Sequence, residues 1–399
     1  MYATSFPSLT VYWVPLRIVD LFSGCGGLSY GGHLAASATG IEVSTLAAVD
    51  LWSAACATYE QNMGFAPTVT PVSVPLLEDL RDKHSTVDLL LGGPPCQGFS
   101  SVGRRALDDP RNQLVKIYVE AVRLLRPKAF LMENVNGFVT LQGGSLFREV
   151  LGSFRGLGYG VFPAMALASA YGVPQHRRRC FIVGFQDGGD FAFPLGAARF
   201  VSPRNGDLVA DMRPEHLDYE KVYSFNDATS DLPGVAAGRA AHSYKCPPQN
   251  AYQRRMRKGS RSLTEHRGAL HHAQLMKLLA YIPAGKSALD DDVFKTIPKA
   301  LRPTSGFGNS YARILGSDPA PTITRNFSTP SSANCIHPTA NRALTVREAA
   351  RCQSFPDVYE FTGTPAEKRL QIGNAVPPLL AQNVITEIVA ELKKRGANL

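Results

Sequence analysis

The 399-residue chain lacks the long apolar segments with which proteins cross membranes. No apolar run approaches the roughly 20 residues that a membrane-spanning helix requires. The first 15 residues contain no basic stretch followed by a long apolar core, so no signal peptide is expected. We therefore expect a protein that does not use a membrane as its partner.

Paired cysteines and sequence repeats are also missing. The seven cysteines are odd in number and form no C-x-x-C pair, which argues against a disulfide framework and against a structural zinc site. The chain has no internal repeat and no low-complexity tract. This cysteine usage fits a reducing compartment, so the sequence predicts a cytoplasmic protein without a bound metal.

The chain has an excess of positive charge and enough apolar residues for a large core. Lys and Arg number 42 against 33 Asp and Glu, a formal net charge of +9, which favours a polyanionic partner. Hydrophobic residues make up 44% of the chain, and its length suggests two domains.

The first half of the sequence alternates short apolar strands with longer amphipathic segments. This pattern predicts a doubly wound α/β sheet. The expected strands are 17–22, 46–50, 87–91, 129–133 and 180–185. One expected helix follows the glycine-rich turn and ends near residue 34, and three others span 53–62, 114–125 and 146–157. From residue 186 to about 370 the periodicity weakens, which indicates a second, irregular domain. Residues 378–394 read as a helix that packs back onto the first domain.

A glycine-rich turn follows the first expected strand and opens a helix. Glycines in DLFSGCGGL (20–28) let backbone amides approach a ligand, and a helix N-terminus favours negative charge. The spacing is not G-x-G-x-x-G, so a nicotinamide site is not expected. Asp50 ends the second strand, where it can bind ribose hydroxyls or cap the following helix, and Leu51 or Trp52 can lie against an adenine ring. A nucleoside cofactor without a pyrophosphate indicates S-adenosylmethionine.

The most informative motif is LGGPPCQGFS at 91–100, which holds Cys96 on a stiff loop after a buried strand. Pro94 and Pro95 fix φ and remove backbone donors, and Gly98 lets the chain turn away. This places a thiol at the carboxyl edge of the sheet, where such sheets bind ligands. The alternative is that Cys96 is one more small buried apolar residue.

Six ordered blocks give the chain a resemblance to a known family. They read DLFSGCGGLS at 20–29, GGPPCQGFS at 92–100, ENV at 133–135, GVPQHRRR at 172–179, RALTVREAARCQSFPD at 342–357 and QIGNAVPP at 371–378. From residue 18 to the C-terminal helix the chain resembles the cytosine-5 DNA methyltransferases. The family often has an acidic residue that contacts the cofactor adenine, whereas residues 71–75 here read PVSVP, so that contact is left unassigned.

The resemblance implies a covalent mechanism. C5 of cytosine is too poor a nucleophile to attack a methyl sulfonium, and a thiolate added at C6 supplies the electron density; Cys96 matches the family nucleophile. Glu133 matches the carboxylate that binds or protonates N3. On an extended segment Arg177 and Arg179 share one face, with Arg179 expected on cytosine O2 and Arg177 as support. Because a base inside a duplex is unreachable, the target must be flipped out.

The resemblance also implies two binding sets. The cofactor, converted to S-adenosyl-L-homocysteine, is expected to contact Phe22, Ser23, Gly24, Cys25, Gly26, Gly27, Asp50, Leu51, Gly93, Pro95, Leu114, Asn374, Ala375 and Val376. Double-stranded DNA is expected to contact Ser100, Arg104, Arg105, Gln175, Arg254, Arg255, Arg257, Lys258 and Arg325, of which the basic cluster at 254–258 suits phosphates. That cluster can also be a solvated surface.

Together these expectations describe a sequence-specific DNA (cytosine-5-)-methyltransferase of a bacterial restriction-modification system. Residues 1–185, completed by 371–399, form the Rossmann-like domain that binds S-adenosylmethionine, and 186–370 the smaller, irregular target-recognition domain. A monomer in the cytoplasm, associated with the nucleoid and served by a separate cognate endonuclease, is expected. One alternative is a tRNA cytosine-5 methyltransferase of the same fold, against which the PPCQGFS block and the long basic second domain favour DNA. The other is a catalytically silent DNA-binding homologue, against which Cys96, Glu133 and Arg179 argue.

A charged group in the 342–357 block and a group of three histidines are also expected to have structural roles. Arg347, Glu348 and Arg351 are expected to form an ion-pair scaffold for the second domain. His266, His271 and His272 lack the partner spacing of a metal site, so they are expected to be structural or to face DNA.

Overall fold

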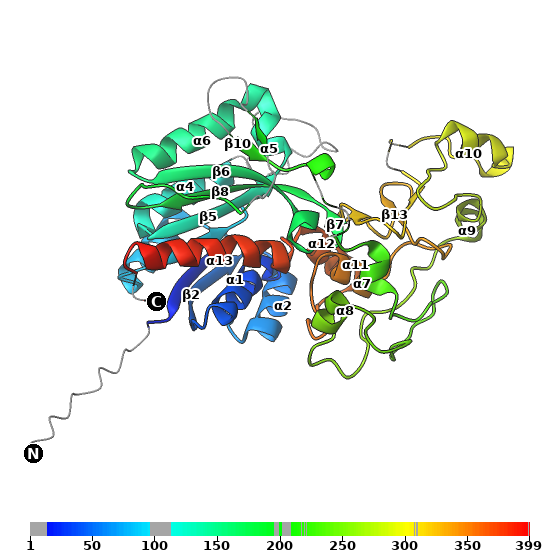
Figure 1. Cartoon of the computed structure of the whole chain (residues 1–399), viewed down its shortest axis with the longest axis horizontal. Helices are drawn as coiled ribbons and strands as arrows, with labels where there is room; N and C mark the ends of the chain where they lie inside the picture. The colour runs from blue at the N-terminus through cyan, green and yellow to red at the C-terminus, as the bar shows by residue number, and fades with distance from the viewer. Residues whose placement is uncertain are drawn as a thin grey trace, which may run out of the picture.

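Two lobes lie side by side in the protein, one built on a large sheet and the other smaller and mostly irregular (Figure 1). The structure is a computed structural model that describes residues 14–95, 113–194, 199–201, 209–216, 218, 220, 222–306, 308, 310–397 and 399. Cys96, Ser100, Arg104 and Arg105, which the sequence places at the active site or the DNA, lie outside the described residues.

The sheet of the first lobe contains nine strands within the described part of the chain, in the order β3-β2-β1-β4-β5-β8-β6-β10-β9. β1 to β5 are parallel, β8 runs antiparallel to both β5 and β6, and β10 is parallel to β6 but antiparallel to β9. The strands are β1 (Leu16–Leu21), β2 (Val43–Asp50), β3 (Thr68–Val69), β4 (Leu89–Gly92), β5 (Ala129–Val135), β6 (Gly160–Leu167), β8 (Arg178–Phe185), β9 (Arg199–Val201) and β10 (Val209–Asp211). The predicted α/β sheet is confirmed.

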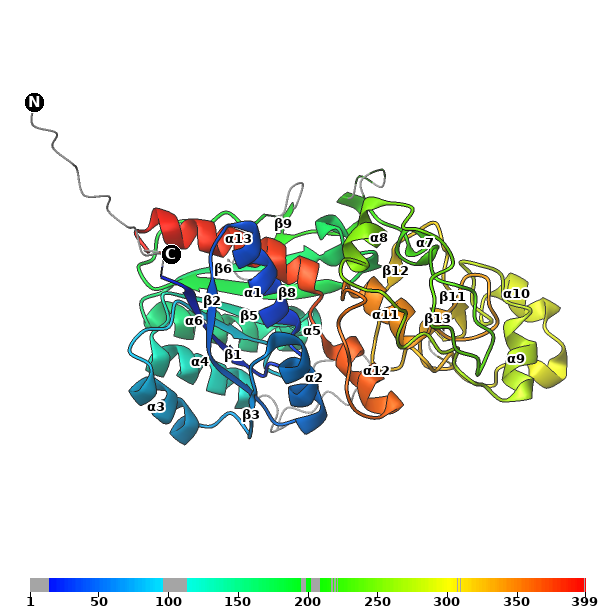
Figure 2. The ribbon, with the colours of Figure 1, turned by 90° about the horizontal axis from the view of Figure 1, so that it is seen from below.

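Helices cover both faces of this sheet (Figure 2). One apolar cluster joins the sheet to α1 (Gly27–Ala38) and α13 (Pro378–Lys394). A second joins its other face to α3 (Val74–Lys83), α4 (Gln113–Leu125) and α6 (Ser145–Gly156). Continuous apolar strands such as β4 arise because their alternate side chains enter opposite clusters. The same lobe contains α2 (Ser53–Met63) and α5 (Gly137–Thr140).

The C-terminal helix α13 packs on α1 through a close contact between small residues. A Cβ atom on Gly31 of α1 would lie 2.4 Å from the Cβ of Ala381, so only glycine allows this approach. Leu380, Val384 and Ile388 recur at helical spacing on α13 and are fully buried. The predicted helix 378–394, and its packing against the first lobe, are confirmed.

The second lobe consists of short helices and small two-stranded sheets. Its helices are α7 (Phe225–Thr229), α8 (Ala251–Met256), α9 (Ala273–Leu279), α10 (Asp291–Thr296), α11 (Val346–Cys352) and α12 (Pro365–Asn374). β11 (Ala312–Arg313) pairs with β13 (Asn334–Ile336), and β12 (Ala320–Pro321) pairs with β7 (Gln175–His176) of the first lobe. β9 and β10 belong to the large sheet although they follow residue 185, where the predicted first domain ends. The division into two domains stays a prediction.

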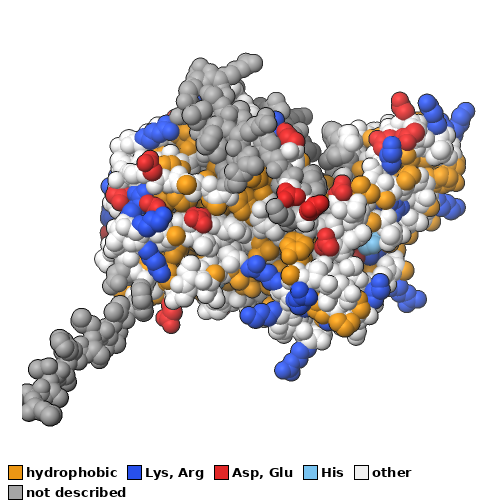
Figure 3. Space-filling view, viewed as in Figure 1, with side chains coloured by type: hydrophobic (Ala, Val, Ile, Leu, Met, Phe, Trp, Pro, Cys, Tyr) orange, Lys and Arg blue, Asp and Glu red, His pale blue; other side chains and the backbone are white. Residues whose placement is uncertain are grey.

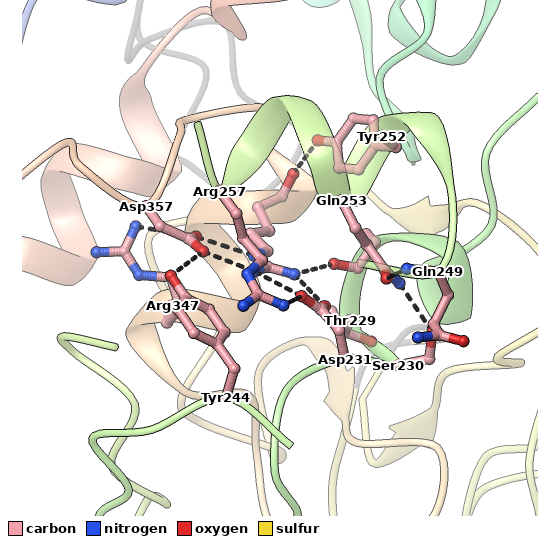
Figure 4. A network of polar contacts seen from close by, with 12 residues as sticks. Thr229, Ser230, Asp231, Tyr244, Gln249, Tyr252, Gln253, Arg257, Arg347 and Asp357 are labelled. Carbon is pink, nitrogen blue, oxygen red and sulfur yellow. Dashed lines mark hydrogen bonds and ion pairs between the residues drawn. The ribbon is translucent and has the colours of Figure 1, made fainter. Parts of the chain in front are cut away.

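A buried network of charged and polar groups includes Asp231, Tyr244 and Asp357 (Figure 4). Arg351 of α11, which is fully buried, joins its two carboxylates. Its guanidinium donates to Asp357 at 2.9 and 2.6 Å and to Asp231 at 2.5 and 3.2 Å. Although burial alone raises it, the hydrogen bonds from Arg351 lower the pKa of Asp357 below its usual value. Tyr244 donates to Asp357 at 2.7 Å, and the guanidinium of Arg257 stacks 3.7 Å from the centre of the Tyr244 ring.

The expected ion-pair scaffold is confirmed, with partners that the sequence did not indicate. Glu348 pairs with Arg342 at 2.8 Å, and Arg347 lies 3.7 Å from Asp357. Glu348 also closes a capping box with Thr345 at the start of α11. The network therefore fixes α11 against segments more than 100 residues earlier in the chain.

None of the described helices has the length and apolar character needed to cross a bilayer.

Candidate active site

The carboxyl ends of three neighbouring strands bring the predicted motifs together. Leu21 of β1 pairs with Gly92 of β4, and Gly92 pairs with Met132 of β5. The glycine loop, the proline loop and Glu133 therefore leave the sheet side by side. Ligands of open α/β sheets bind at this edge.

The loop after β1 has a backbone conformation that residues with a side chain rarely adopt. Gly24 and Gly26 have φ of 54° and 87°, and Phe22 has a φ of 58°, which is strained for a residue with a Cβ. A Cβ on Gly26 would lie 3.0 Å from both the Tyr59 ring and the Tyr359 hydroxyl, and a Cβ on Gly27 would lie 2.3 Å from the Val376 carbonyl. The loop is therefore held between two tyrosines and the chain that precedes α13.

Asp50 holds this loop against the end of β2. One carboxylate oxygen accepts the Gly24 N–H at 2.8 Å and the other accepts the Trp52 N–H at 2.8 Å. Trp52, not Asp50, is the N-cap residue of α2, and no side chain caps that helix. Each oxygen keeps a second lone pair, so Asp50 can still accept ribose hydroxyls. Leu51 beside it is 67% exposed, as a surface for an adenine ring requires.

Asp20 is a candidate that the sequence analysis did not assign. It is fully buried at the end of β1, where one oxygen accepts the Ser29 hydroxyl at 2.6 Å. Its other oxygen, and the hydroxyl of buried Ser23, have no partner among the described residues. Burial raises the pKa of Asp20 to about 7. A carboxylate inside an apolar strand, followed by a glycine loop, is the sequence signal that could have identified it.

The proline loop is anchored next to Glu133. Asn134 donates to the Pro94 carbonyl at 3.3 Å, and a Cβ on Gly93 would lie 3.3 Å from a Glu133 carboxylate oxygen. The described part of this loop ends at Pro95, one residue before Cys96. A side chain at position 93 would therefore crowd the Glu133 carboxylate.

Glu133 and Arg179 form a buried ion pair across β5 and β8. Arg179 Nε lies 2.9 Å from Glu133 Oε1, and only 11% of the Glu133 side chain is exposed. Burial raises the pKa of Glu133, and the charges of Arg179 and Arg177 limit that rise. A carboxyl group with a raised pKa can hold or donate a proton closer to neutral pH, as a general acid does.

Arg177 and Gln175 are buried rather than directed to an open surface. Arg177 is 1% exposed and donates to the carbonyls of Ile323 and Gly373 at 2.9 and 3.1 Å. Gln175, which the sequence placed at the DNA, is fully buried, and its amide group is bonded to Ile323, Cys352 and Gln353. We therefore assign Gln175 to the joint between the lobes, because its polar atoms are already used inside the protein.

The predicted basic cluster divides into exposed and internal residues. Arg254 and Lys258 are exposed, whereas Arg257 pairs with Asp231 at 3.3 Å and donates to the Cys246 carbonyl at 2.7 Å, so its guanidinium is directed inward. Arg255 is bonded to Gln382 of α13, which joins the two lobes. Lys and Arg side chains gather at the lower edge of the second lobe, around α8, on the face seen in Figure 3.

The histidines and several predicted cofactor contacts have clear positions. His266 lies between Thr345 and the Pro233 carbonyl, His271 accepts the Ala343 N–H, and His272 caps α9, so each has a hydrogen-bond partner within the protein. Cys25 is buried in the apolar cluster of the second lobe, and burial raises its pKa to about 12. Asn374 is exposed, and Leu114 and Ala375 are half-buried.

The sequence profile of the C-5 cytosine-specific DNA methylase family matches residues 16–390. The chain belongs to this family. The methylase is 35% identical to the type II methyltransferase M.DdeI of Desulfomicrobium norvegicum over 94% of this chain and 88% of the relative. It is 34% identical to the type II methyltransferase M.AgeI of Thalassovita gelatinovora over 92% and 97%.

Solved structures share the fold. A DNA modification methyltransferase encoded within an E. coli prophage aligns with a TM-score of 0.70 at 24% identity, over 95% of the methylase and 99% of that chain. Spodoptera frugiperda DNMT2 aligns with a TM-score of 0.59 at 16% identity, over 94% and 99%. Its membership of the family, and not the shared fold, makes the methylase a DNA (cytosine-5-)-methyltransferase that uses S-adenosylmethionine as methyl donor and acts on DNA through a covalent cysteine mechanism.

The residues at the edge of the sheet fit this cofactor. S-adenosylmethionine carries a cationic methionine part and a ribose, and the edge offers an unpartnered buried carboxylate oxygen on Asp20 and free acceptor positions on Asp50. When bound, the cofactor supplies the methyl group as an electrophile on a sulfonium. The protein has to orient it and exclude water.

Proposed function

We propose that the methylase modifies C5 of a flipped-out cytosine within a specific double-stranded DNA sequence, as the modification enzyme of a restriction system. The observation that carries the proposal is the buried Glu133–Arg179 pair beside Gly93, at the edge where β1 ends and the glycine loop begins. A pyrimidine at this edge would meet an acid, a guanidinium and the loop that carries a thiol.

Each of these groups has a separate task in the proposed reaction. The Cys96 thiolate adds to C6, and Glu133 protonates or hydrogen-bonds N3 as negative charge reaches the ring. Arg179 stabilises O2, and Arg177 fixes the segment that carries it. After methyl transfer to C5, water removes the C5 proton and the thiolate leaves C6, which restores the aromatic ring.

The cofactor site is proposed to consist of the glycine loop, the end of β2 and the chain before α13. Asp50 would accept the ribose hydroxyls, Leu51 would lie on the adenine, and Asp20 and Ser23 would meet the methionine part. Backbone amides of the glycine loop suit its carboxylate. The remaining predicted contacts are Phe22, Gly24, Cys25, Gly26, Gly27, Gly93, Pro95, Leu114, Asn374, Ala375 and Val376.

The second lobe is proposed to bind the DNA and select its sequence. The exposure of Arg254, Lys258 and Arg325 supports contacts with phosphates, and Ser100, Arg104 and Arg105 would close over the target. We propose a bacterial, cytoplasmic monomer, associated with the nucleoid, whose cognate endonuclease acts separately. The type II relatives support this assignment.

The proposed substrate is tested by expressing the chain in a host that lacks cytosine methylation and sequencing its DNA after bisulfite treatment. We expect methylated cytosines confined to one short sequence context. Purified protein should also transfer label from S-adenosylmethionine to duplex DNA and not to tRNA. Label on tRNA alone, or methylation without sequence preference, would contradict the proposal.

We expect the affinity for S-adenosylhomocysteine to rise about tenfold between pH 6 and pH 8. In the free protein, burial raises the pKa of Asp20 to about 7, so at pH 6 about nine-tenths of it is protonated. The ligand ammonium favours the ionised carboxylate, so binding releases a proton below this pKa and becomes pH-independent above it.

Isothermal titration calorimetry at several pH values measures this dependence. Asp20→Asn should lower the affinity at pH 8 and remove the rise, whereas Asp82→Asn, a change at an exposed carboxylate, should keep it. An affinity that is flat across this range in the unaltered protein would disprove the role of Asp20.

A further inference from the structure

Buried hydrogen bonds of Gln175 and Arg177, on the segment that leads to Arg179, join the two lobes. Gln175 Oε1 accepts the Ile323 N–H at 2.7 Å. Its Nε2 donates to the Cys352 carbonyl at 3.0 Å and to Gln353 Oε1 at 2.9 Å. One buried amide of the first lobe therefore holds two segments of the second.

Arg177 holds the other polar group of Ile323. Its guanidinium donates to the Ile323 carbonyl at 2.9 Å and to the carbonyls of Gly373 and Asn374 at 3.1 and 3.5 Å. The N–H and the C=O of Ile323 are thus both held by side chains that stand two residues apart in the first lobe. Because Gln175, Arg177 and Ile323 are buried, losing one partner leaves another unsatisfied.

Gln353 extends the same arrangement to the turn between α12 and α13. Its Nε2 donates to the Ile372 carbonyl at 2.6 Å and to the Ala375 carbonyl at 3.4 Å. We call Gln175, Arg177 and Gln353 the interlobe clamp. It holds the segment around Ile323 and the turn 372–375 in one fixed relation.

The turn held by the clamp touches both proposed binding regions. On one side the Val376 carbonyl packs against Gly27 of the glycine loop, where a Cβ would lie 2.3 Å away. On the other side, a Cβ on Gly373 would lie 2.3 Å from the Arg325 backbone nitrogen. Such close-packed contacts transmit displacements, because neither partner has room to move alone.

We propose that the interlobe clamp couples the cofactor site to the segment 322–325, so that a filled cofactor site raises the affinity for DNA. The inference rests on the proposed function, since it assigns the glycine loop to the cofactor and Arg325 to the DNA. Gln175 and Gln353 are positioning residues that contact neither ligand. By linkage, DNA raises the affinity for the cofactor by the same factor.

The test measures the affinity for duplex DNA with and without saturating S-adenosylhomocysteine, by fluorescence anisotropy, in the full chain. We expect the ligand to tighten DNA binding at least about fivefold in the unaltered protein. Gln353→Met keeps the side-chain volume but removes the bonds to the turn. In this variant we expect less than about twofold tightening, with each separate affinity changed by less than about threefold.

A second variant and a control keep the test specific. Gly373→Ala forces the turn away from Arg325 and should also reduce the coupling. Asn62→Ala removes a different interlobe contact, the hydrogen bonds of Asn62 with the backbone of Glu360 at 2.8 and 2.9 Å, and should leave the coupling unchanged.

Two outcomes of these measurements would contradict the coupling. Unchanged coupling in Gln353→Met, or both affinities falling in step with the melting temperature in both clamp variants, would overturn the inference. The second result would mean that the clamp only stabilises the fold. If the unaltered chain bound neither DNA nor S-adenosylhomocysteine, the proposed function would fail instead.

Discussion

Replacing Cys96 by serine is expected to abolish methyl transfer while DNA binding survives. A cysteine thiol is a few per cent ionised at neutral pH and its thiolate is a strong nucleophile, whereas a serine hydroxyl is not ionised. Without addition at C6, the ring cannot supply electrons at C5. Removal of a nucleophile typically lowers turnover by about 10⁴-fold or more.

Transfer of labelled methyl groups to DNA measures this loss, and anisotropy measures the binding that remains. DNA containing 5-fluorocytosine should trap the unaltered chain covalently and fail to trap Cys96→Ser. Cys246→Ser is a matched control, because Cys246 is a half-buried thiol of the second lobe, distant in sequence from the glycine loop, the proline loop and Glu133. Retained turnover in Cys96→Ser would remove the catalytic assignment.

Glu133→Gln is expected to slow methyl transfer by about 10²- to 10⁴-fold, the usual contribution of a general acid. Glutamine has nearly the same size and can still accept a hydrogen bond from Arg179, but it has no proton to give to N3. Because burial raises the pKa of Glu133, the protonated form is more accessible in this site than in water.

Single-turnover kinetics with saturating DNA and cofactor isolate this step from binding. Glu149→Gln provides the control, because Glu149 forms an exposed ion pair with Lys116 on the same lobe. A rate for Glu133→Gln within threefold of the unaltered enzyme, in a protein with the same circular dichroism, would contradict the assignment.

The sequence predicted those helices and strands whose pattern of apolar and polar side chains shows which faces are buried. The apolar runs at 87–91 and 129–133 correspond to β4 and β5, and the amphipathic segment 378–394 coincides with α13. β6 was missed because Pro163 and Gly160 interrupt its pattern, and α3 was missed although Pro75 occupies its first turn, a common position for proline. The antiparallel direction of β8 depends on strand pairing, which local patterns do not report.

The sequence likewise predicted some features of the candidate site and not others. Motif residues such as Glu133 and Arg179 were predicted from their blocks, and the structure adds their ion pair. The burial of Gln175 and Arg177 could not be predicted, because their partners lie 146 to 197 residues later in the chain. Whether a polar residue faces solvent or bonds to distant backbone is settled by tertiary packing.

The second lobe contains an apolar cluster of its own around α9 and α10. Leu278, Leu279, Ile282, Val293 and Ile297 form this cluster together with Ile336 of β13. A segment that has its own apolar core can be lengthened, shortened or replaced during evolution while the active site of the first lobe stays intact. Under the proposed function, exchange of the segment around α9 and α10 would change the target sequence and leave the chemistry of the first lobe in place.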